Sequence, residues 1–137
     1  QRTAFDSDPD SFSAGVEANQ EALQQRVVEA QQRLDQVTID DDLRLRISAV
    51  CGELDVDGLR GDIVTNRAAR ALAAFEGRTD VSEDDVARVA SCCLRHRLRK
   101  DPLEQVDSGD RVVKMFCKVF ERSEGSDRAD FELALAA

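Results

Sequence analysis

Apolar residues in this chain recur at helical spacing in one segment after another, and no segment alternates as a β-strand would. The clearest run follows the pattern i, i+4, i+7, i+8 and i+11, with Leu43, Ile47, Val50, Cys51 and Leu54. Residues at this spacing lie on one face of a helix, which must be buried against other helices. We therefore predict an all-α fold, a bundle of about five helices with short connections.

The helix boundaries are predicted from capping residues and from helix breakers. Ser82 and Asp85 form a near capping box, and Gly77 supplies a stop after the third helix. We expect helices from Pro9 to Val37, after Asp40 to Leu54, from Asp57 or Gly58 to Phe75, from Ser82 to Lys100, and from Asp107 or Ser108 through Phe120. The third helix is expected to bury Val64, Ala68, Ala71, Leu72 and Phe75, and the fourth Val86, Val89, Ala90, Cys93 and Leu94.

These helices predict one helical domain over residues 1–122, followed by a polar and then Ala-rich tail over 123–137 that is loosely held. The 137 residues suit a single domain with a modest core. The chain begins at Gln1 rather than Met, so we expect that it is part of a longer protein.

Charge and composition exclude some classes of partner. The net charge is −9, and there is neither Trp nor Tyr for stacking on bases. An acidic chain is repelled by nucleic acid and by acidic membrane surfaces. No apolar run approaches the roughly 18 residues that a membrane span needs. We expect no nucleic-acid partner and no membrane span.

Motifs for complete catalytic sites are absent from the sequence. It contains neither the G-x-x-x-x-G-K-[ST] phosphate loop nor G-x-G-x-x-G. His96 and Cys92 are spaced i, i+4, but too few ligands accompany them for a zinc site, and we predict no metal site. The basic run RHRLRK at residues 95–100 is favourable at a helix C-terminus through the helix dipole, and phosphate binding is the less favoured alternative.

Arg60 occupies an unusual place, in the first turn of the third predicted helix and between Gly58 and Gly61. A cation is unfavourable at a helix N-terminus, which carries a partial positive charge. Two interpretations remain open from the residues alone. Arg60 forms a surface ion pair with Asp57 or Asp62, or it faces an anion such as a phosphate together with the helix end.

A longer stretch around Arg60 carries a specific resemblance. The sequence DGLRGDIVTNRAA, followed by CLRHRLRKDPLE, closely resembles the C-terminal helical lid of the magnesium chelatase ATPase subunit, the I subunit. The similarity covers most of residues 1–121. Members of this family are AAA+ ATPases that form rings and use ATP to drive insertion of Mg²⁺ into protoporphyrin IX, the first committed step toward chlorophyll.

The resemblance implies roles for particular residues and partners. Arg60 matches the sensor-2 arginine, which contacts ATP phosphates, and Gly58 and Gly61 would let the helix end approach the nucleotide. ATP and its Mg²⁺ would be bound mainly by an N-terminal domain that is missing here. The implied partners are neighbouring I subunits in a ring, the D subunit and, through it, the porphyrin-binding H subunit. The implied location is the chloroplast stroma, or the cytoplasm of a photosynthetic bacterium.

The sequence departs from the family by lacking the Walker A, Walker B, sensor-1 and arginine-finger elements. We therefore expect the lid alone, inactive as an ATPase by itself but part of an enzyme. Two alternatives are a free-standing acidic helical protein-interaction module and the lid of a MoxR-like AAA+ chaperone. The stretch CLRHRLRKDPLE argues against the second alternative.

The cysteines give a further hypothesis. Cys51 and Cys93 both fall on predicted inward faces, whereas Cys92 points elsewhere on its helix. They form a candidate redox pair that closes a reversible disulfide, and the alternative is that both are small buried core residues. Plastid members of the family respond to thioredoxin, and the resemblance therefore favours the redox pair.

Overall fold

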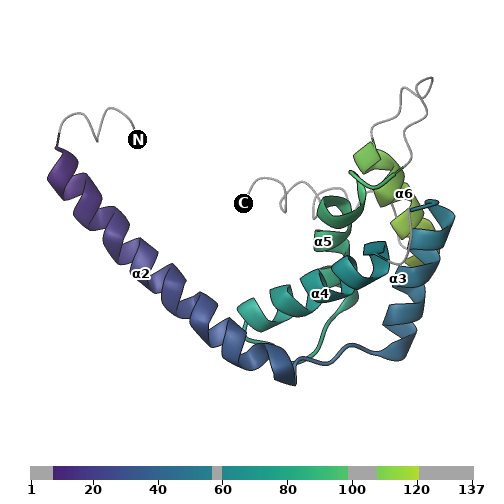
Figure 1. The fold of residues 1–137 in the computed structure, drawn as a ribbon, viewed down its shortest axis with the longest axis horizontal. Helices are drawn as coiled ribbons and strands as arrows, with labels where there is room; N and C mark the ends of the chain where they lie inside the picture. Colours follow the sequence, from purple (N-terminus) through teal and green to yellow (C-terminus); the bar gives the residue numbers. More distant parts are fainter. Residues whose placement is uncertain (1–7, 57–59, 99–107, 121–137) are drawn as a thin grey trace.

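The computed structural model describes residues 8–56, 60–98 and 108–120, and these ranges are almost entirely helical (Figure 1). They contain the helices α2 (Pro9–Arg33), α3 (Asp41–Glu53), α4 (Arg60–Phe75), α5 (Glu83–Leu94) and α6 (Ser108–Phe120), with a 3₁₀ turn at Leu34–Gln36. The predicted all-α fold with five helices is confirmed. No helix in this part of the chain is long and apolar enough to cross a membrane.

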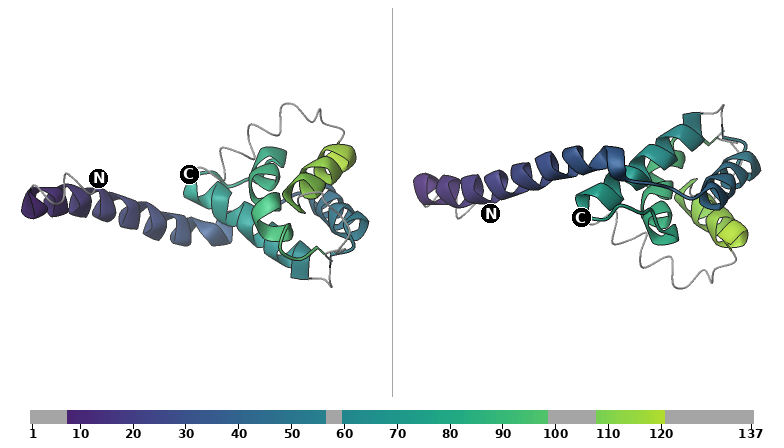
Figure 2. Two further views of the ribbon diagram at one scale, coloured as in Figure 1. Left: turned by 90° about the horizontal axis from the view of Figure 1, so that it is seen from above. Right: turned by 90° about the horizontal axis from the view of Figure 1, so that it is seen from below.

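The helix α2 extends away from the other four helices, which pack together (Figure 2). It ends at Arg33 rather than at the predicted Val37, which is extended and buried. The large apolar side chains of α2 whose burial is described, between Val16 and Val28, are exposed, and Ala30, near the end of the helix, is buried. Four exposed aliphatic side chains follow the helix, namely Val16, Leu23, Val27 and Val28.

Hydrogen bonds from arginine side chains to backbone carbonyls hold the end of α2 against α4. The Arg33 guanidinium donates to the Ala74 carbonyl at 2.8 Å, and Arg70 donates to the carbonyls of Leu34 and Val37 at 3.1 Å each. The Arg26 guanidinium also lies 4.4 Å from the centre of the Phe75 ring, which is a favourable cation–π contact. These contacts join α2 to the C-terminal end of α4.

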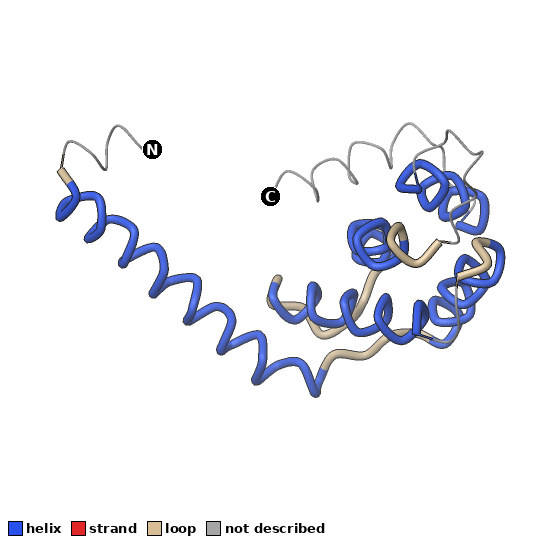
Figure 3. The backbone as a smooth tube through the Cα atoms, turned by 45° about the horizontal axis from the view of Figure 1, so that its top comes forward, coloured by secondary structure: helices blue, strands red, loops and turns tan. Residues whose placement is uncertain are grey.

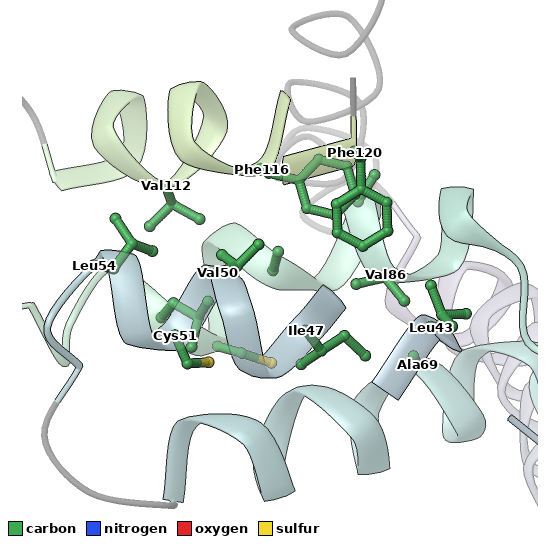
Figure 4. Packing of buried hydrophobic residues seen from close by; sticks show 14 of the residues in the cluster. Leu43, Ile47, Val50, Cys51, Leu54, Ala69, Val86, Val112, Phe116 and Phe120 are labelled. Atoms are coloured by element: carbon green, nitrogen blue, oxygen red, sulfur yellow. The ribbon is translucent and has the colours of Figure 1, made fainter. Parts of the chain in front are cut away.

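The predicted apolar face of α3 forms the centre of the main core. All five residues of the run from Leu43 to Leu54 are buried. Figure 4 shows Phe116 and Phe120 pointing from α6 toward the same interior as Val50, and the two rings stack with centroids 4.1 Å apart. The helix starts where it was expected, because the Asp40 carboxylate accepts the backbone N–H of Asp42.

The buried face of α4 differs from the prediction. Ala71 is exposed and Leu72 and Phe75 are only partly buried. The residues that α4 buries are small, namely Gly61, Thr65, Ala69, Ala73 and Ala74. Small side chains let the helix backbone come close to α3 and α5, so size rather than hydrophobicity selects this face.

The connection between α4 and α5 is built as the sequence indicates. Gly77 has a positive φ of 83°, and the N–H groups of Gly77 and Arg78 return to the carbonyls of Ala74 and Ala73. This is a Schellman motif, which needs a residue such as glycine at that position. The capping box of Ser82 and Asp85 then starts α5.

A buried ion pair at this connection was not predicted. Asp85 is 1% exposed. Its carboxylate accepts hydrogen bonds from Nη1 and Nη2 of Arg78, at 2.7 and 2.5 Å. Burial raises the pKa of Asp85, but the hydrogen bonds from Arg78 and Ser82 outweigh burial and lower it. Glu76 accepts from Arg78 and Arg88, whose hydrogen bonds lower the pKa of that carboxyl. The network ties the start of α5 to the end of α4.

The helix α5 ends at Leu94, earlier than the predicted Lys100, and the chain continues as a turn to Leu98. Val89 is only partly buried, whereas the other residues of the predicted inward face are buried. The tail over 123–137, and with it the predicted domain boundary after residue 122, lies outside the described residues.

Candidate functional site

Arg60 is the first residue of α4 and is exposed. Within the described residues its guanidinium makes neither a hydrogen bond nor an ion pair. Asp62 does not pair with it, because the Asp62 carboxylate accepts from the Ser48 hydroxyl at 2.7 Å and from the Cys51 thiol. The other candidate, Asp57, lies outside the described residues. In this part of the structure Arg60 is therefore a cation without a partner at a helix N-terminus.

Gly61 seats the start of α4 against the core. A Cβ atom at this position would lie 2.8 Å from Cγ1 of Val56, and 3.3 Å from both Sγ of Cys51 and Cδ2 of Leu94. Contacts below 3 Å force a neighbour to move, so the backbone here reaches the core only because residue 61 has no side chain. The predicted nucleotide-binding role of Gly61 stays a prediction, and Gly58 lies outside the described residues.

The end of α3 places Val56 against this glycine. The N–H groups of Asp55 and Val56 return to the carbonyls of Gly52 and Cys51, both at 3.1 Å. Asp55 has a φ of 50°, the left-handed conformation that the Schellman motif requires and that Asp tolerates better than most residues. This turn directs Val56 back toward Gly61, the residue after Arg60.

The turn after α5 lies beside the start of α4, because Leu94 contacts the position of Gly61. Arg97 donates from its Nε to the Cys93 carbonyl at 3.2 Å, and its N–H donates to the Leu94 carbonyl at 2.8 Å. Part of the basic run thus binds helix carbonyls, as expected at a helix C-terminus. Arg95 and His96 are exposed, while Arg99 and Lys100 lie outside the described residues.

The cysteines lie as their helix positions predicted. Cys51 and Cys93 are buried in one core cluster, Cys92 is exposed, and all four cysteines are free thiols. Burial raises the pKa of Cys51, as do its hydrogen bond to Asp62 and, to a smaller extent, the nearby Cys93. Burial likewise raises the pKa of Cys93, with a smaller contribution from Cys92. Both thiols are therefore protonated at neutral pH, and the disulfide between them stays a prediction.

The described residues contain no group of three or more His, Cys, Asp or Glu side chains that could hold a metal ion. What the structure brings together at one end of the bundle is the start of α4 and the turn after α5. Figure 3 shows the loop that follows α5 on the same side of the molecule as the start of α4.

The class of protein follows from a family comparison, with which the helical arrangement agrees. The sequence model of the AAA lid domain family matches residues 44–115, which include α4, α5 and most of α3 and α6. The chain belongs to this family.

Similarity to individual proteins is more specific than the match to the family model. The chain is 64% identical over 120 residues to the magnesium-chelatase subunit ChlI of Synechocystis sp., covering 88% of this chain and 34% of that protein. It is 60% identical to the ChlI subunit of Anabaena variabilis, covering 88% of this chain and 36% of the relative. It is 57% identical to the chloroplastic ChlI subunit of Chlamydomonas reinhardtii, covering 88% and 29%. The chain spans about a third of the length of the curated relatives it matches.

Proposed function

We propose that this chain is the lid of a magnesium chelatase ATPase subunit and that Arg60 contacts the phosphates of bound ATP as the sensor-2 residue. Relatives that are 57–64% identical are named magnesium-chelatase subunits, which supports the first part. The activity of the whole subunit belongs to the same proposal. The whole subunit would couple ATP hydrolysis to the insertion of Mg²⁺ into protoporphyrin IX.

The observation that carries the second part is the state of Arg60. It is an exposed cation at a helix N-terminus, with no partner among the described residues. An anion beside it would be attracted both by the guanidinium and by the free N–H groups of the helix end. A triphosphate supplies such an anion, and a planar guanidinium can donate two parallel hydrogen bonds to phosphate oxygens. The residues present therefore fit ATP as a ligand that is held mainly by another domain.

In this proposal Arg60 is a contact that the chain makes to phosphates held mainly by another domain. The sequence of the chain contains no G-x-x-x-x-G-K-[ST] loop to cradle the phosphates. We therefore expect no ATP turnover from the isolated chain, and sustained phosphate release by a purified sample would contradict this. The Mg²⁺ that accompanies ATP would be bound mainly outside this chain.

The partners follow from the same proposal. Neighbouring I subunits form the ring, the D subunit contacts it, and the porphyrin-binding H subunit is reached through D. A chloroplastic relative and cyanobacterial relatives support a chloroplast stroma or a bacterial cytoplasm as the location.

We also propose that Cys51 and Cys93 form a reversible disulfide that regulates the subunit. Both thiols lie in one buried cluster, and each comes from a helix that packs near the start of α4. Forming the bond passes two electrons to a disulfide-bearing oxidant and releases two protons. Since burial keeps both thiols protonated, exchange requires the core to open at this end.

The test of the sensor-2 role uses a full-length subunit that carries this lid. Arg60→Ala should lower ATP turnover by about 10³-fold, because an arginine that stabilises developing phosphate charge has effects of that order. Arg60→Lys should restore turnover only in part, since the ammonium lacks the planar fork of the guanidinium. Circular dichroism should show unchanged helicity in both variants.

Arg67 provides the matched control. It is a second exposed arginine of α4, without a partner in the described part of the chain, and Arg67→Ala should leave turnover near the unmodified level. Unmodified turnover in Arg60→Ala would show that the sensor-2 assignment is wrong. An equal loss in both variants would point to a general effect of charge on α4.

A further inference from the structure

The arginines of the described residues fall into two groups. Most of them bind carboxylates, backbone carbonyls or an aromatic ring, as expected in a chain with a net charge of −9. Three have exposed side chains without a hydrogen bond, an ion pair or a ring contact in this part of the structure: Arg60, Arg67 and Arg95. Because carboxylates are abundant in this chain, an arginine that is left unpaired is a candidate for binding an anion from outside the chain.

Two of these three arginines lie at the same end of the bundle. Gly61, next to Arg60, is packed against Leu94, next to Arg95, so that a Cβ on residue 61 would be 3.3 Å from the Leu94 side chain. Arg67 lies two turns further along α4 and away from this contact. Arg60 and Arg95 are thus the chain neighbours of two residues that contact each other, one at the start of α4 and one at the end of α5.

The turn that carries Arg95 is firmly held. Leu94 and Leu98 on either side of it are buried, at 1% and 6% exposure. The Arg97 side chain and backbone are both bonded to carbonyls at the end of α5, as described above. The exposed Arg95 and His96 therefore project from a turn whose backbone is anchored to the core at both ends. A rigid base of this kind lowers the entropic cost of binding a ligand.

We propose that Arg95 is a second phosphate-binding residue, which acts with Arg60 on the polyphosphate of a bound nucleotide. Two guanidinium groups, one from the start of α4 and one from the turn after α5, can contact different oxygens of one polyphosphate chain through charge-assisted hydrogen bonds. The basic run at residues 95–97 then has two roles: Arg97 binds the helix end, and Arg95 faces the ligand. The proposal rests on the proposed function, because the nucleotide is held by another domain.

The experiment measures nucleotide affinity in a full-length subunit with this lid, using a fluorescent ATP analogue as the probe. Arg95→Ala should weaken binding about tenfold, the effect of losing one charge-assisted hydrogen bond to phosphate. Arg95→Lys should recover part of the affinity, because it keeps the charge. Arg67→Ala is the control, an arginine with the same exposure and no partner, and its affinity should not change. Circular dichroism checks that each variant keeps its helicity.

The outcomes separate this inference from the proposed function. If Arg60→Ala weakens binding and Arg95→Ala does not, the role of Arg95 is refuted while that of Arg60 stands. If Arg95→Ala and Arg67→Ala weaken binding equally, the effect is a general one of charge and the inference is overturned. If Arg60→Ala also leaves affinity unchanged, both proposals fail. If charge reversal by Arg95→Glu weakens binding no more than Arg95→Ala does, the guanidinium does not face the phosphates.

Discussion

Gly61→Ala adds one methyl group where the start of α4 meets the core. The new Cβ would lie 2.8 Å from Val56 Cγ1, with Cys51 and Leu94 at 3.3 Å closing two other directions. The Val56 backbone is held by the hydrogen bond from its N–H to the Cys51 carbonyl, and its β-branched side chain has few favourable rotamers by which to move away. Overpacking of this kind costs about 1–3 kcal/mol, and the gain in helix propensity offsets at most about 1 kcal/mol. We expect a net loss of about 1–2 kcal/mol in the free energy of unfolding.

Gly52→Ala makes the same chemical change at a place with room for it. Gly52 lies in α3, is exposed, and a Cβ there would have no heavy atom within 4 Å. This substitution should stabilise the chain by about 0.5–1 kcal/mol, since alanine has less backbone freedom to lose in the unfolded state. The two glycines therefore predict shifts of opposite sign.

Urea denaturation followed by circular dichroism at 222 nm measures both shifts. The midpoint of Gly61→Ala should fall and that of Gly52→Ala should rise, with unchanged slopes. The close packing described for Gly61 would be refuted if its alanine variant were as stable as Gly52→Ala. Gly61→Val serves as a second test, because a larger side chain must cost more than the methyl group if the space is filled.

Two further predictions concern the buried pair and the cysteines. Asp85→Asn should lower the free energy of unfolding by about 2 kcal/mol at neutral pH, less than for a fully buried pair because water reaches Arg78. Since the folded pKa of Asp85 is lowered, its stabilisation is present above the unfolded carboxyl value near 3.9 and is lost as the pH falls through the folded pKa. Urea titrations at neutral and acid pH should therefore converge for the parent and Asp85→Asn, and a constant difference would contradict this assignment. Mild oxidation of a full-length subunit followed by peptide mapping should find Cys51 joined to Cys93, and Cys51→Ser or Cys93→Ser should remove the difference in ATPase activity between oxidised and reduced protein. If that difference persists in both variants, the redox switch lies elsewhere.

Several elements could be predicted because short-range rules govern them. The α3 face is a run of large aliphatic side chains at helical spacing, and it is buried as a whole. Gly77 and the pair of Ser82 and Asp85 set helix ends through hydrogen bonds that span only a few residues. All the residues that determine each of these features lie within one short stretch of sequence.

The face of α4 could not be predicted in this way. Apolar spacing predicts Leu72 and Ala71 on the buried face of α4. The helix instead buries Gly61 and Thr65, because α3 and α5 approach it closely. The requirement for small residues comes from the neighbouring helices, which the local sequence does not describe. The partner of Asp85 was missed for a similar reason, since Arg78 reaches it only after the turn at Gly77 has formed.

In the candidate site, too, the local feature could be predicted and the long-range contact could not. The position of Arg60 at a helix start could be predicted from the glycines and the apolar pattern. The contact between Gly61 and Leu94, on which the proposal for Arg95 rests, could not be predicted, because these residues are 33 positions apart in the sequence. The resemblance to a known family suggests the proposed role of Arg60 but assigns nothing to Arg95.

The joint between α2 and α4 has a mechanical consequence. Arg60 stands at one end of α4, a rod of 16 residues and about 24 Å, and the carbonyls and arginines that hold α2 stand at the other end. The arm formed by α2 has 25 residues and is about 37 Å long. If α2 and α4 turn as one body by about 10° around this joint, the far end of the arm moves through roughly 6 Å and the Arg60 end of α4 through roughly 4 Å, from the same helical rise. The shape is that of a lever, with Arg60 on the shorter side and the exposed arm of α2 on the longer side.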